Sequence, residues 1–334
     1  MNTVHAPSLW QRVNRREFWV LVLLAVTVAI VSIKNPNFRQ VANIRNLLVN
    51  AAPTTIVACG MTLVIVTGEI DISVGSLMGL MAAVIGATSS SKFMALPAGV
   101  TIALVLLLGL AAGVLTGLLV TLGRVPSIVV TLGMMMALLG VNKLFLSAYN
   151  DSIEVSLLAP ALRWLDKGTV LWVPAPLWVA LAVIAATKVL VYCTPLGRRI
   201  YAVGSAPRAA LLAGLSPTRI KLFVFALTGV LVGVAAILRV PQLAKIESGI
   251  GQGLELLAVT CVVVGGTSMS GGKGTILGSV FAVLLLSSVG SVLLFLRLGQ
   301  TATYWEQAVQ GGFILAAVLA DHLATRRRRT EALA

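Results

Sequence analysis

The sequence predicts an all-α, polytopic integral membrane protein with about ten transmembrane helices. Of its 334 residues, 58% are hydrophobic and only 11% are charged, whereas soluble globular domains are about 45–50% apolar and about 25% charged. The hydrophobic residues also fall into separate runs of the length that crosses roughly 30 Å of hydrocarbon, which takes about 20 helical residues. The 31 glycines fit the same class, because small residues let transmembrane helices pack closely. Lipid is therefore the solvent that accepts this much apolar surface.

Ten apolar runs are candidate spans. The first follows a basic N-terminus, as in a signal peptide, but no small-residue cleavage site precedes Lys34, so we expect a retained first helix. The eighth run is short, which indicates a broken, tilted or re-entrant helix and a total of roughly nine to eleven spans. In order, the runs are Phe18–Ile33, Leu47–Thr67, Ile72–Ser90, Leu96–Leu122, Ser127–Leu146, Pro176–Cys193, Ile220–Leu238, Leu254–Thr267, Thr275–Leu296 and Trp305–Ala320.

Lysine and arginine between the runs predict the orientation. If the N-terminus is cytoplasmic, 14 basic residues fall in cytoplasmic segments and 9 in outside segments, as the positive-inside rule favours. The longest outside loop, Ser147–Ala175, is expected to rest on the membrane surface. We expect one membrane domain over residues 1–334, made of a cytoplasmic N-terminus (1–17), a helical membrane domain (18–320) with a long basic cytoplasmic loop (194–219), and a basic cytoplasmic tail (321–334).

Composition excludes several other classes. A net charge of +14 would suggest nucleic acid in a soluble protein, but here membrane topology accounts for the basic residues between the runs. The three cysteines show no CxxC spacing, and the two histidines, His5 and His322, lie near opposite ends of the chain. We therefore expect no metal site, no disulfide framework, no cofactor and no catalytic centre.

The segment Gly68–Ser76 places two carboxylates, Glu69 and Asp71, between two apolar runs. Asp71 just before Ser73 suits a helix N-terminus, where a carboxylate bonds free backbone N–H groups. The functional alternative is that Asp71 also fixes helix geometry at a gate or beside a permeation path, since acids near membrane depth are rarely idle. The candidate gate residues are Gly68, Asp71, Ser73, Gly75 and Ser76.

A second glycine hairpin, Gly266–Gly274, joins the eighth and ninth runs. Such hairpins in two halves of a chain are typical of repeat-built transporters, and chance similarity of Gly/Ser turns is an equal alternative. A phosphate-binding loop would need glycine in place of Thr267 and Ser or Thr in place of Gly274. We therefore expect no ATP site in this chain, which is not an enzyme. The candidate residues are Gly265, Gly266, Gly271 and Gly272.

The basic loop Thr194–Ser216 is rich in glycine and alanine. It predicts a short helix, Arg208–Ala213, which Gly214 ends. A helix with small residues on one side can dock tightly into a groove on a partner protein. The alternative is an ordinary cytoplasmic loop that obeys the positive-inside rule.

Taken together, these segments resemble the permease subunits of ribose-type ABC importers, a family that serves ribose, xylose, arabinose, rhamnose and autoinducer-2. The resemblance runs from about Phe18 to Asp321. Its motifs are far more specific than hydropathy. They are Gly60–Gly68, Ile70–Ser76, Val125–Gly133, Gly197–Gly204 and Gly265–Gly274.

The resemblance implies an ABC importer permease fold in the bacterial cell inner membrane. The implied partners are ATP-binding cassette ATPase subunits, a periplasmic solute-binding protein, a second permease that is identical or paralogous, and the lipid bilayer, with no nucleic acid. The resemblance also implies that Gly197–Gly214 supplies the coupling helix against the ATPases. The expected coupling residues are Gly197, Arg198, Tyr201, Gly204, Arg208, Ala209, Ala210 and Gly214.

Departures from the family pattern bear on the solute. Glu69 stands where the family usually has glycine, Ser205 and Pro207 replace an asparagine-containing turn, and Lys143 lies where an Arg-Gly pair is common. They favour a rhamnose- or autoinducer-2-like solute over ribose. We expect sugar transport, the import of a monosaccharide or related polyol-like solute driven by partner ATPases. The main alternative is an ATP-independent secondary transporter or facilitator, and a second is a membrane-embedded enzyme.

Overall fold

The structure is a computed structural model that describes residues 15–295, 301, 304–305, 308–316 and 319. Helices form most of this part of the chain. They are α2 (Arg15–Lys34), α3 (Val41–Val66), α4 (Val74–Ser89), α5 (Ala98–Thr121), α6 (Ser127–Ser147), α7 (Pro160–Lys167), α8 (Ala175–Cys193), α9 (Pro195–Ser205), α10 (Pro207–Leu212), α11 (Pro217–Arg239), α12 (Leu254–Val264) and α13 (Ile276–Phe295), with 3-10 helices η1 (Pro36–Arg39), η2 (Val155–Leu157) and η3 (Val240–Gln242).

The expected spans match these helices closely. The first seven coincide with α2, α3, α4, α5, α6, α8 and α11, and the ninth coincides with α13. Leu296 and parts of the tenth run, Trp305–Ala320, lie outside the described residues, and residues 308–316 of that run are helical. Within the described residues, six helices are long and apolar enough to cross a membrane. The mostly helical class is confirmed, and the count of ten spans stays a prediction.

The eighth expected span is a short helix. α12 has 11 residues, which gives a length of about 16 Å, far below the roughly 30 Å of a hydrocarbon core. It begins after Gly253 and ends at Gly265, so glycines bound it on both sides. The chain therefore passes through this region on a helix that is shorter than a hydrocarbon core.

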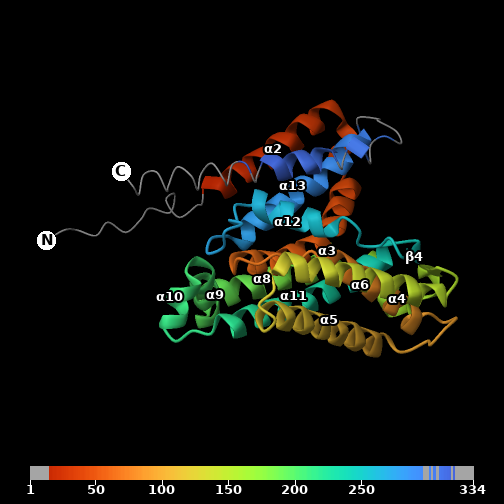
Figure 1. Ribbon diagram of the computed structural model, residues 1–334. Coiled ribbons are helices and arrows are strands. Elements are labelled where there is room, and N and C mark those ends of the chain that lie inside the picture. Colours follow the sequence, from red (N-terminus) through yellow and green to blue (C-terminus); the bar gives the residue numbers. More distant parts are fainter. Residues whose placement is uncertain (1–14, 296–300, 302–303, 306–307, 317–318, 320–334) are drawn as a thin grey trace.

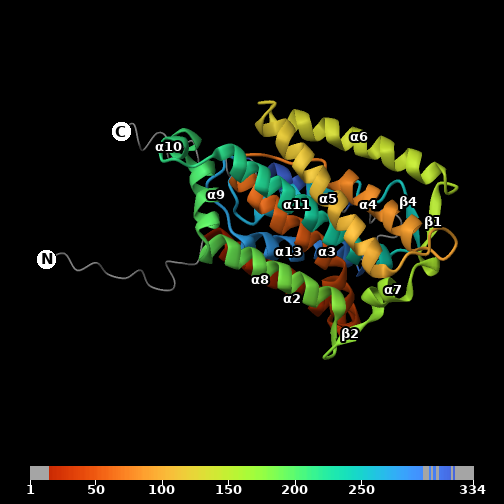
Figure 2. The same ribbon diagram turned by 90° about the horizontal axis from the view of Figure 1, so that it is seen from below.

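α3 is the centre of the bundle. Its residues from Ala51 to Val66 are buried except for the half-buried Thr54. α11 packs on one side of it, with α5 beyond α11, and α13 packs on the other side, with α2 beyond α13 (Figures 1 and 2). The outer faces of α5, α6 and α8 expose large apolar side chains such as Leu107, Leu144 and Leu181, as contact with lipid requires.

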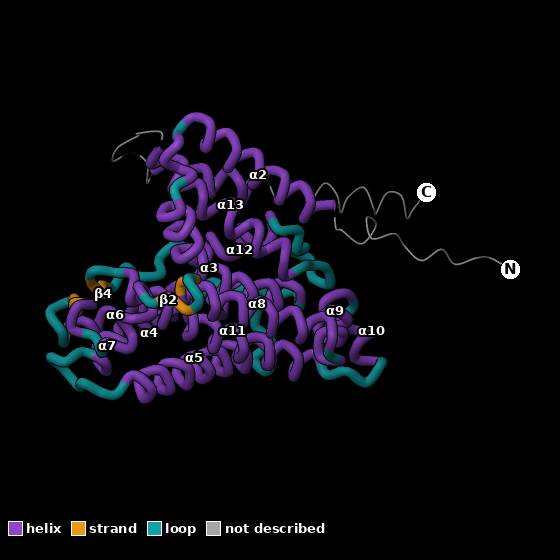
Figure 3. Tube along the Cα trace, turned by 180° about the vertical axis from the view of Figure 1, so that it is seen from behind, coloured by secondary structure: helices purple, strands orange, loops and turns teal. Residues whose placement is uncertain are grey.

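One end of the bundle carries a small sheet, and we call it the sheet face. Strand β1 (Ser152–Glu154) pairs antiparallel with β4 (Lys245–Glu247), and the paired Ile153 and Ile246 are both buried. A two-stranded hairpin, β2 (Thr169–Val170) with β3 (Val173–Pro174), lies at the same end with α7 (Figure 3). The expected surface loop Ser147–Ala175 thus folds into these elements, and Ser91 donates a backbone hydrogen bond to Leu157.

The opposite end holds α9 and α10, and we call it the α9 face (Figure 1). The expected short helix Arg208–Ala213 is present as α10, which begins one residue earlier at Pro207. The longer α9 was not predicted. Its start is well defined, because the Thr194 side chain accepts a hydrogen bond from the Gly197 N–H and Pro195 occupies the first turn.

Candidate functional site

Asp71 organises the first hairpin, between α3 and α4. Its Oδ1 accepts hydrogen bonds from the Ser73 backbone N–H at 2.9 Å and from the Ser73 hydroxyl at 2.6 Å. This is the helix-start role predicted for an acid at this position. The carboxyl is buried, and its burial raises its pKa, while the two bonds from Ser73 act in the opposite direction. The two bonds from Ser73 fix the orientation of the Asp71 carboxyl at the start of α4.

The same hairpin is tied to two other helices. Ser127, at the start of α6, accepts a hydrogen bond from the Ile70 N–H at 3.1 Å, and the Thr131 hydroxyl donates to the Ile70 carbonyl at 3.3 Å. Glu69 forms an ion pair with Lys221, in the first turns of α11. Both side chains are mostly buried, with exposures of 14% for Glu69 and 20% for Lys221. Movement of α11 therefore bears directly on this hairpin.

The second hairpin and α9 meet the first hairpin at the α9 face. The Gly272 N–H donates to the Val66 carbonyl at 2.8 Å. The Tyr201 hydroxyl donates to the Gly274 carbonyl at 2.7 Å, and the Ser205 hydroxyl donates to the Gly272 carbonyl at 3.4 Å. Burial raises the pKa of Tyr201, so its hydroxyl remains a donor well above neutral pH.

Gly204 makes this junction possible. A Cβ at this position would overlap the Val66 carbonyl oxygen and lie 2.8 Å from the Gly272 nitrogen. Any larger residue would separate α9 from both hairpins. Three segments that were predicted separately, Gly68–Ser76, Gly197–Gly204 and Gly265–Gly274, are thus brought together as one junction, which we call the glycine junction.

Two further candidate glycines also lie against backbone. A Cβ on Gly75 would overlap the Gly251 carbonyl oxygen, and a Cβ on Gly265 would overlap Gly278 in α13. Both positions therefore require close backbone packing. The remaining hairpin candidates, Gly68, Gly266, Gly271 and the half-buried Ser76, lie in or beside the turns.

α10 presents a mixed surface beside the junction. Ala210 is 5% exposed, so it packs against this chain and is not available to a partner. The outward residues are Arg208 and Ala209, together with Leu211 and Leu212, whose exposures are 61% and 90%. Sequence reasoning singled out the small alanines and missed the two leucines, although two adjacent leucines in a basic loop were visible in the sequence.

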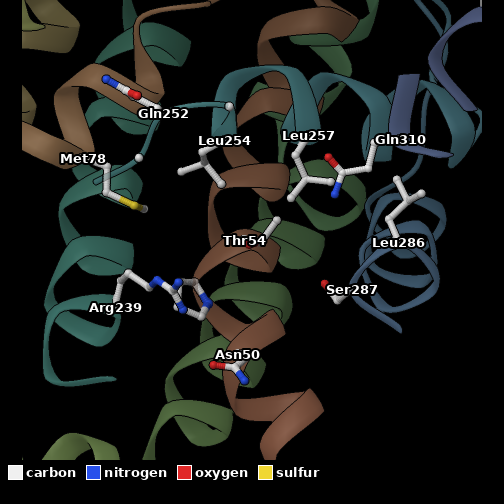
Figure 4. A pocket seen from close by; sticks show the side chains of 13 residues that line it. Asn50, Thr54, Met78, Arg239, Gln252, Leu254, Leu257, Leu286, Ser287 and Gln310 are labelled. Atoms are coloured by element: carbon white, nitrogen blue, oxygen red, sulfur yellow. The ribbon is translucent and has the colours of Figure 1, made fainter. Parts of the chain in front are cut away.

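The sheet-face half of the bundle contains a cavity of about 670 Å³ between α3, α11, α12 and α13 (Figure 4). Sequence reasoning assigned no residue to it. Its polar lining includes Asn50, Thr54, Arg239, Gln252 and Ser287. Among the residues that the structure describes, no group of three or more His, Cys, Asp or Glu is placed to hold a metal ion.

Comparisons with known proteins give the family. Residues 43–318 match the family model described as "Branched-chain amino acid transport system / permease component". The chain is 38% identical over 302 residues to the ribose import permease protein RbsC of Escherichia coli (strain K12). The aligned region covers 90% of this chain and 92% of that protein.

Two further relatives extend the match. The L-arabinose ABC transporter permease protein AraH of Azospirillum brasilense is 31% identical over 327 residues, covering 96% of this chain and 91% of AraH. The autoinducer 2 import system permease protein LsrC of Yersinia enterocolitica is 31% identical over 312 residues, covering 92% and 83%. No solved structure matches the chain. With its helical bundle and nearly full-length relatives, this chain belongs to the family of branched-chain amino acid transport system permease components, whose relatives here are permeases of sugar importers.

Proposed function

We propose that this chain is the permease subunit of an ABC importer that carries a monosaccharide or related polyol-like solute across a bacterial inner membrane. The observation that carries the proposal is the match to import permeases over about nine tenths of both chains. The chain itself supplies one membrane domain and performs no bond chemistry. Partner ATPase subunits supply the energy.

The structure supports a specific route for that energy. An ATPase that binds the exposed side of α10 and α9 acts on the glycine junction, because Tyr201 and Gly204 contact the second hairpin directly. α11 follows α10 after a short turn and reaches the first hairpin through Lys221 and Glu69. Displacing α9 would separate both hairpins at once, so a small movement at a partner interface opens one end of the bundle.

The orientation follows from this assignment. The α9 face lies in the cytoplasm with both termini, and the sheet face lies in the periplasm, where a solute-binding protein delivers the solute. A second permease, identical or paralogous, completes the path. The contacts support this arrangement, since β1 and β4 pair across two loops that were both expected outside.

Identity bears on the choice of solute. The ribose permease is 38% identical to this chain, compared with 31% for the autoinducer-2 permease. Glu69 and Lys143 led us to expect a rhamnose- or autoinducer-2-like solute. The sequence identity to these relatives does not add support to that expectation. The proposal names the class of monosaccharides and related polyols.

Reconstitution tests the function. The permease is purified with its ATPase and binding-protein partners, placed in proteoliposomes, and assayed for uptake of labelled ribose, arabinose, rhamnose and autoinducer-2. We expect uptake only when ATP is supplied on the side of the membrane where the ATPase subunits lie, and only when the binding protein is present on the other side. Uptake that persists with an ATPase unable to hydrolyse ATP, or that follows an ion gradient, would identify a secondary transporter instead.

A further inference from the structure

The cavity in the sheet-face half has the size of a small-molecule site. Its volume of about 670 Å³ lies within the roughly 300–1,000 Å³ of typical ligand pockets. It lies between helices of the bundle, and its floor is the buried α3. Toward the α9 face, the glycine junction closes the bundle with backbone contacts.

The polar lining has unused hydrogen-bonding capacity. The side chains of Asn50, Gln252, Thr54 and Ser287 hydrogen-bond to no residue that the structure describes. Each amide offers two donors and one acceptor oxygen, and each hydroxyl offers one donor. Groups of this kind around a cavity bind a ligand that is rich in hydroxyl groups.

Arg239 supplies the one charge among the described lining residues, none of which is acidic. It is the last residue of α11, and its side chain points into the space beside α3 (Figure 4). Gln242 holds it in place, because Gln242 Oε1 accepts from Arg239 Nη1 at 3.3 Å and Gln242 Nε2 donates to the Val49 carbonyl at 3.3 Å. The remaining guanidinium N–H groups are available to neighbouring oxygen atoms of a ligand.

The apolar lining completes the pattern. Met78, Leu257 and Leu286 lie among the polar groups. A monosaccharide has hydroxyl groups on its rim and C–H groups on its faces, so it matches a lining that mixes donors with apolar side chains. A hydrocarbon ligand would leave the amides of Asn50 and Gln252 and the remaining guanidinium N–H groups of Arg239 unsatisfied, which is unfavourable.

We propose that this cavity is a solute-binding site within the permease, where a monosaccharide in transit hydrogen-bonds to Arg239, Asn50 and Gln252. The inference rests on the proposed function and deepens it by naming the residues that hold the solute. Because the site is positively charged, it disfavours solutes with an ammonium group.

Cysteine protection tests the site directly. Exposed Cys193 is changed to Ser, while Cys59 and Cys261 are buried and stay. In this background Ser287→Cys places a thiol in the cavity, and the complete transporter in nanodiscs is labelled with a water-soluble maleimide. We expect at least one of ribose, arabinose or rhamnose to slow the labelling severalfold. Thr54→Cys is a second reporter at the same cavity.

Two variants separate binding from folding. Arg239→Gln and Gln252→Leu should each raise the half-protecting sugar concentration, by about tenfold for Arg239→Gln, because a charge-assisted hydrogen bond is lost. Gln252 is exposed, so its change leaves the fold intact. Arg163→Gln, an exposed arginine on α7 at the same face, is the matched control and should change nothing.

The results that would overturn this binding site differ from the results that would overturn the proposed function. If no sugar protects either reporter, or if Arg239→Gln and Gln252→Leu leave protection unchanged, the site is wrong even when ATP-driven uptake is normal. Equal protection at an exposed control, Arg163→Cys, would also overturn it. Loss of the second permease on size-exclusion chromatography of Arg239→Gln would assign the cavity to a subunit interface instead. Failure of wild-type uptake, in contrast, would concern the proposed function alone.

Discussion

The two ends of the bundle are built in opposite ways. At the α9 face, the backbones of Val66, Gly204 and Gly272 touch, and no side chain separates them. At the sheet-face half, long side chains such as Arg239 and Gln252 surround an open cavity. An end that is sealed by backbone contacts opens only when whole segments move, whereas an end lined by side chains adapts to a ligand by rotamer changes alone.

This contrast assigns different tasks to the two ends. Whole segments are what a partner protein can displace, so the sealed end is the one to which an energy source should attach. The adaptable end is the one that should meet the solute. In the structure, backbone contacts close the glycine junction while the cavity in the sheet-face half stays unfilled.

Gly204→Val should have the largest effect on the sealed end of the bundle. Its side chain would overlap Val66, and we expect a loss of about 3 kcal/mol of stability at the junction, the upper part of the usual range for overpacking. Transport should be lost. Uptake in proteoliposomes and thermal unfolding in detergent measure both effects. Gly140→Ala in α6, where a Cβ meets nothing within 4 Å, is the control and should be neutral or slightly stabilising.

A second test removes the proposed attachment at the sealed end. Leu211→Asp with Leu212→Asp should weaken ATPase binding by about 2 kcal/mol, or roughly 30-fold, because exposed apolar anchors at an interface are lost. Stability should stay unchanged, since both leucines are exposed. Co-purification and a binding titration measure the effect. Leu171→Asp, an equally exposed leucine of the sheet face, should bind the ATPase normally, and an equal loss there would contradict the assignment.

The ion pair between the hairpin and α11 gives a smaller effect. Glu69→Gln leaves Lys221 without its partner, and we expect a loss on the order of 1 kcal/mol after allowing for partial solvent screening. The uptake rate should fall with it. The exchanged pair, Glu69→Lys with Lys221→Glu, should recover most of the loss in a double-mutant cycle. No recovery would mean that the charges act separately.

Tyr201→Phe is the mildest change at the sealed end. It removes one hydroxyl that donates to Gly274, at a cost of about 1 kcal/mol. Because burial raises the pKa of Tyr201 in the folded protein, its contribution is complete below the unfolded pKa of about 10 and is lost as pH rises through the folded value. Alkaline unfolding curves should therefore converge for wild type and variant, and a constant difference at all pH values would argue against this bond.

Hydropathy predicted the ends of the long helices well, because each must hide its backbone polar groups inside the bilayer and so follows the apolar run. α3 was the exception, since it begins at Val41, before its apolar run at Leu47. α9 was missed because Gly197 and Gly204 lower helix propensity and suggested a loop. Thr194 and Pro195 were the signal for it, as a cap and first-turn residue.

Long-range placement could not be predicted from the same pattern. The candidate glycines were identified by motif, but their meeting at one junction depends on how α3, α9 and α13 pack. Arg239 was assigned to an outside segment by counting basic residues, and only the structure shows that it lines the cavity. Ala210 was expected to be available to a partner protein, but it is buried. On a helix as short as α10, the packing of the neighbouring α9 and α11 decides which side chains are buried.

The shortness of α12 has an electrical consequence. Since this helix covers about 16 Å and the cavity lies at its N-terminal end, the proposed placement in the membrane would make the insulating layer thinner here than the surrounding bilayer. A membrane voltage would then fall mainly across the remaining thickness, near the α9 face. Charges that shift there, such as Glu69 and Lys221, would sense a steeper field than Arg239 does.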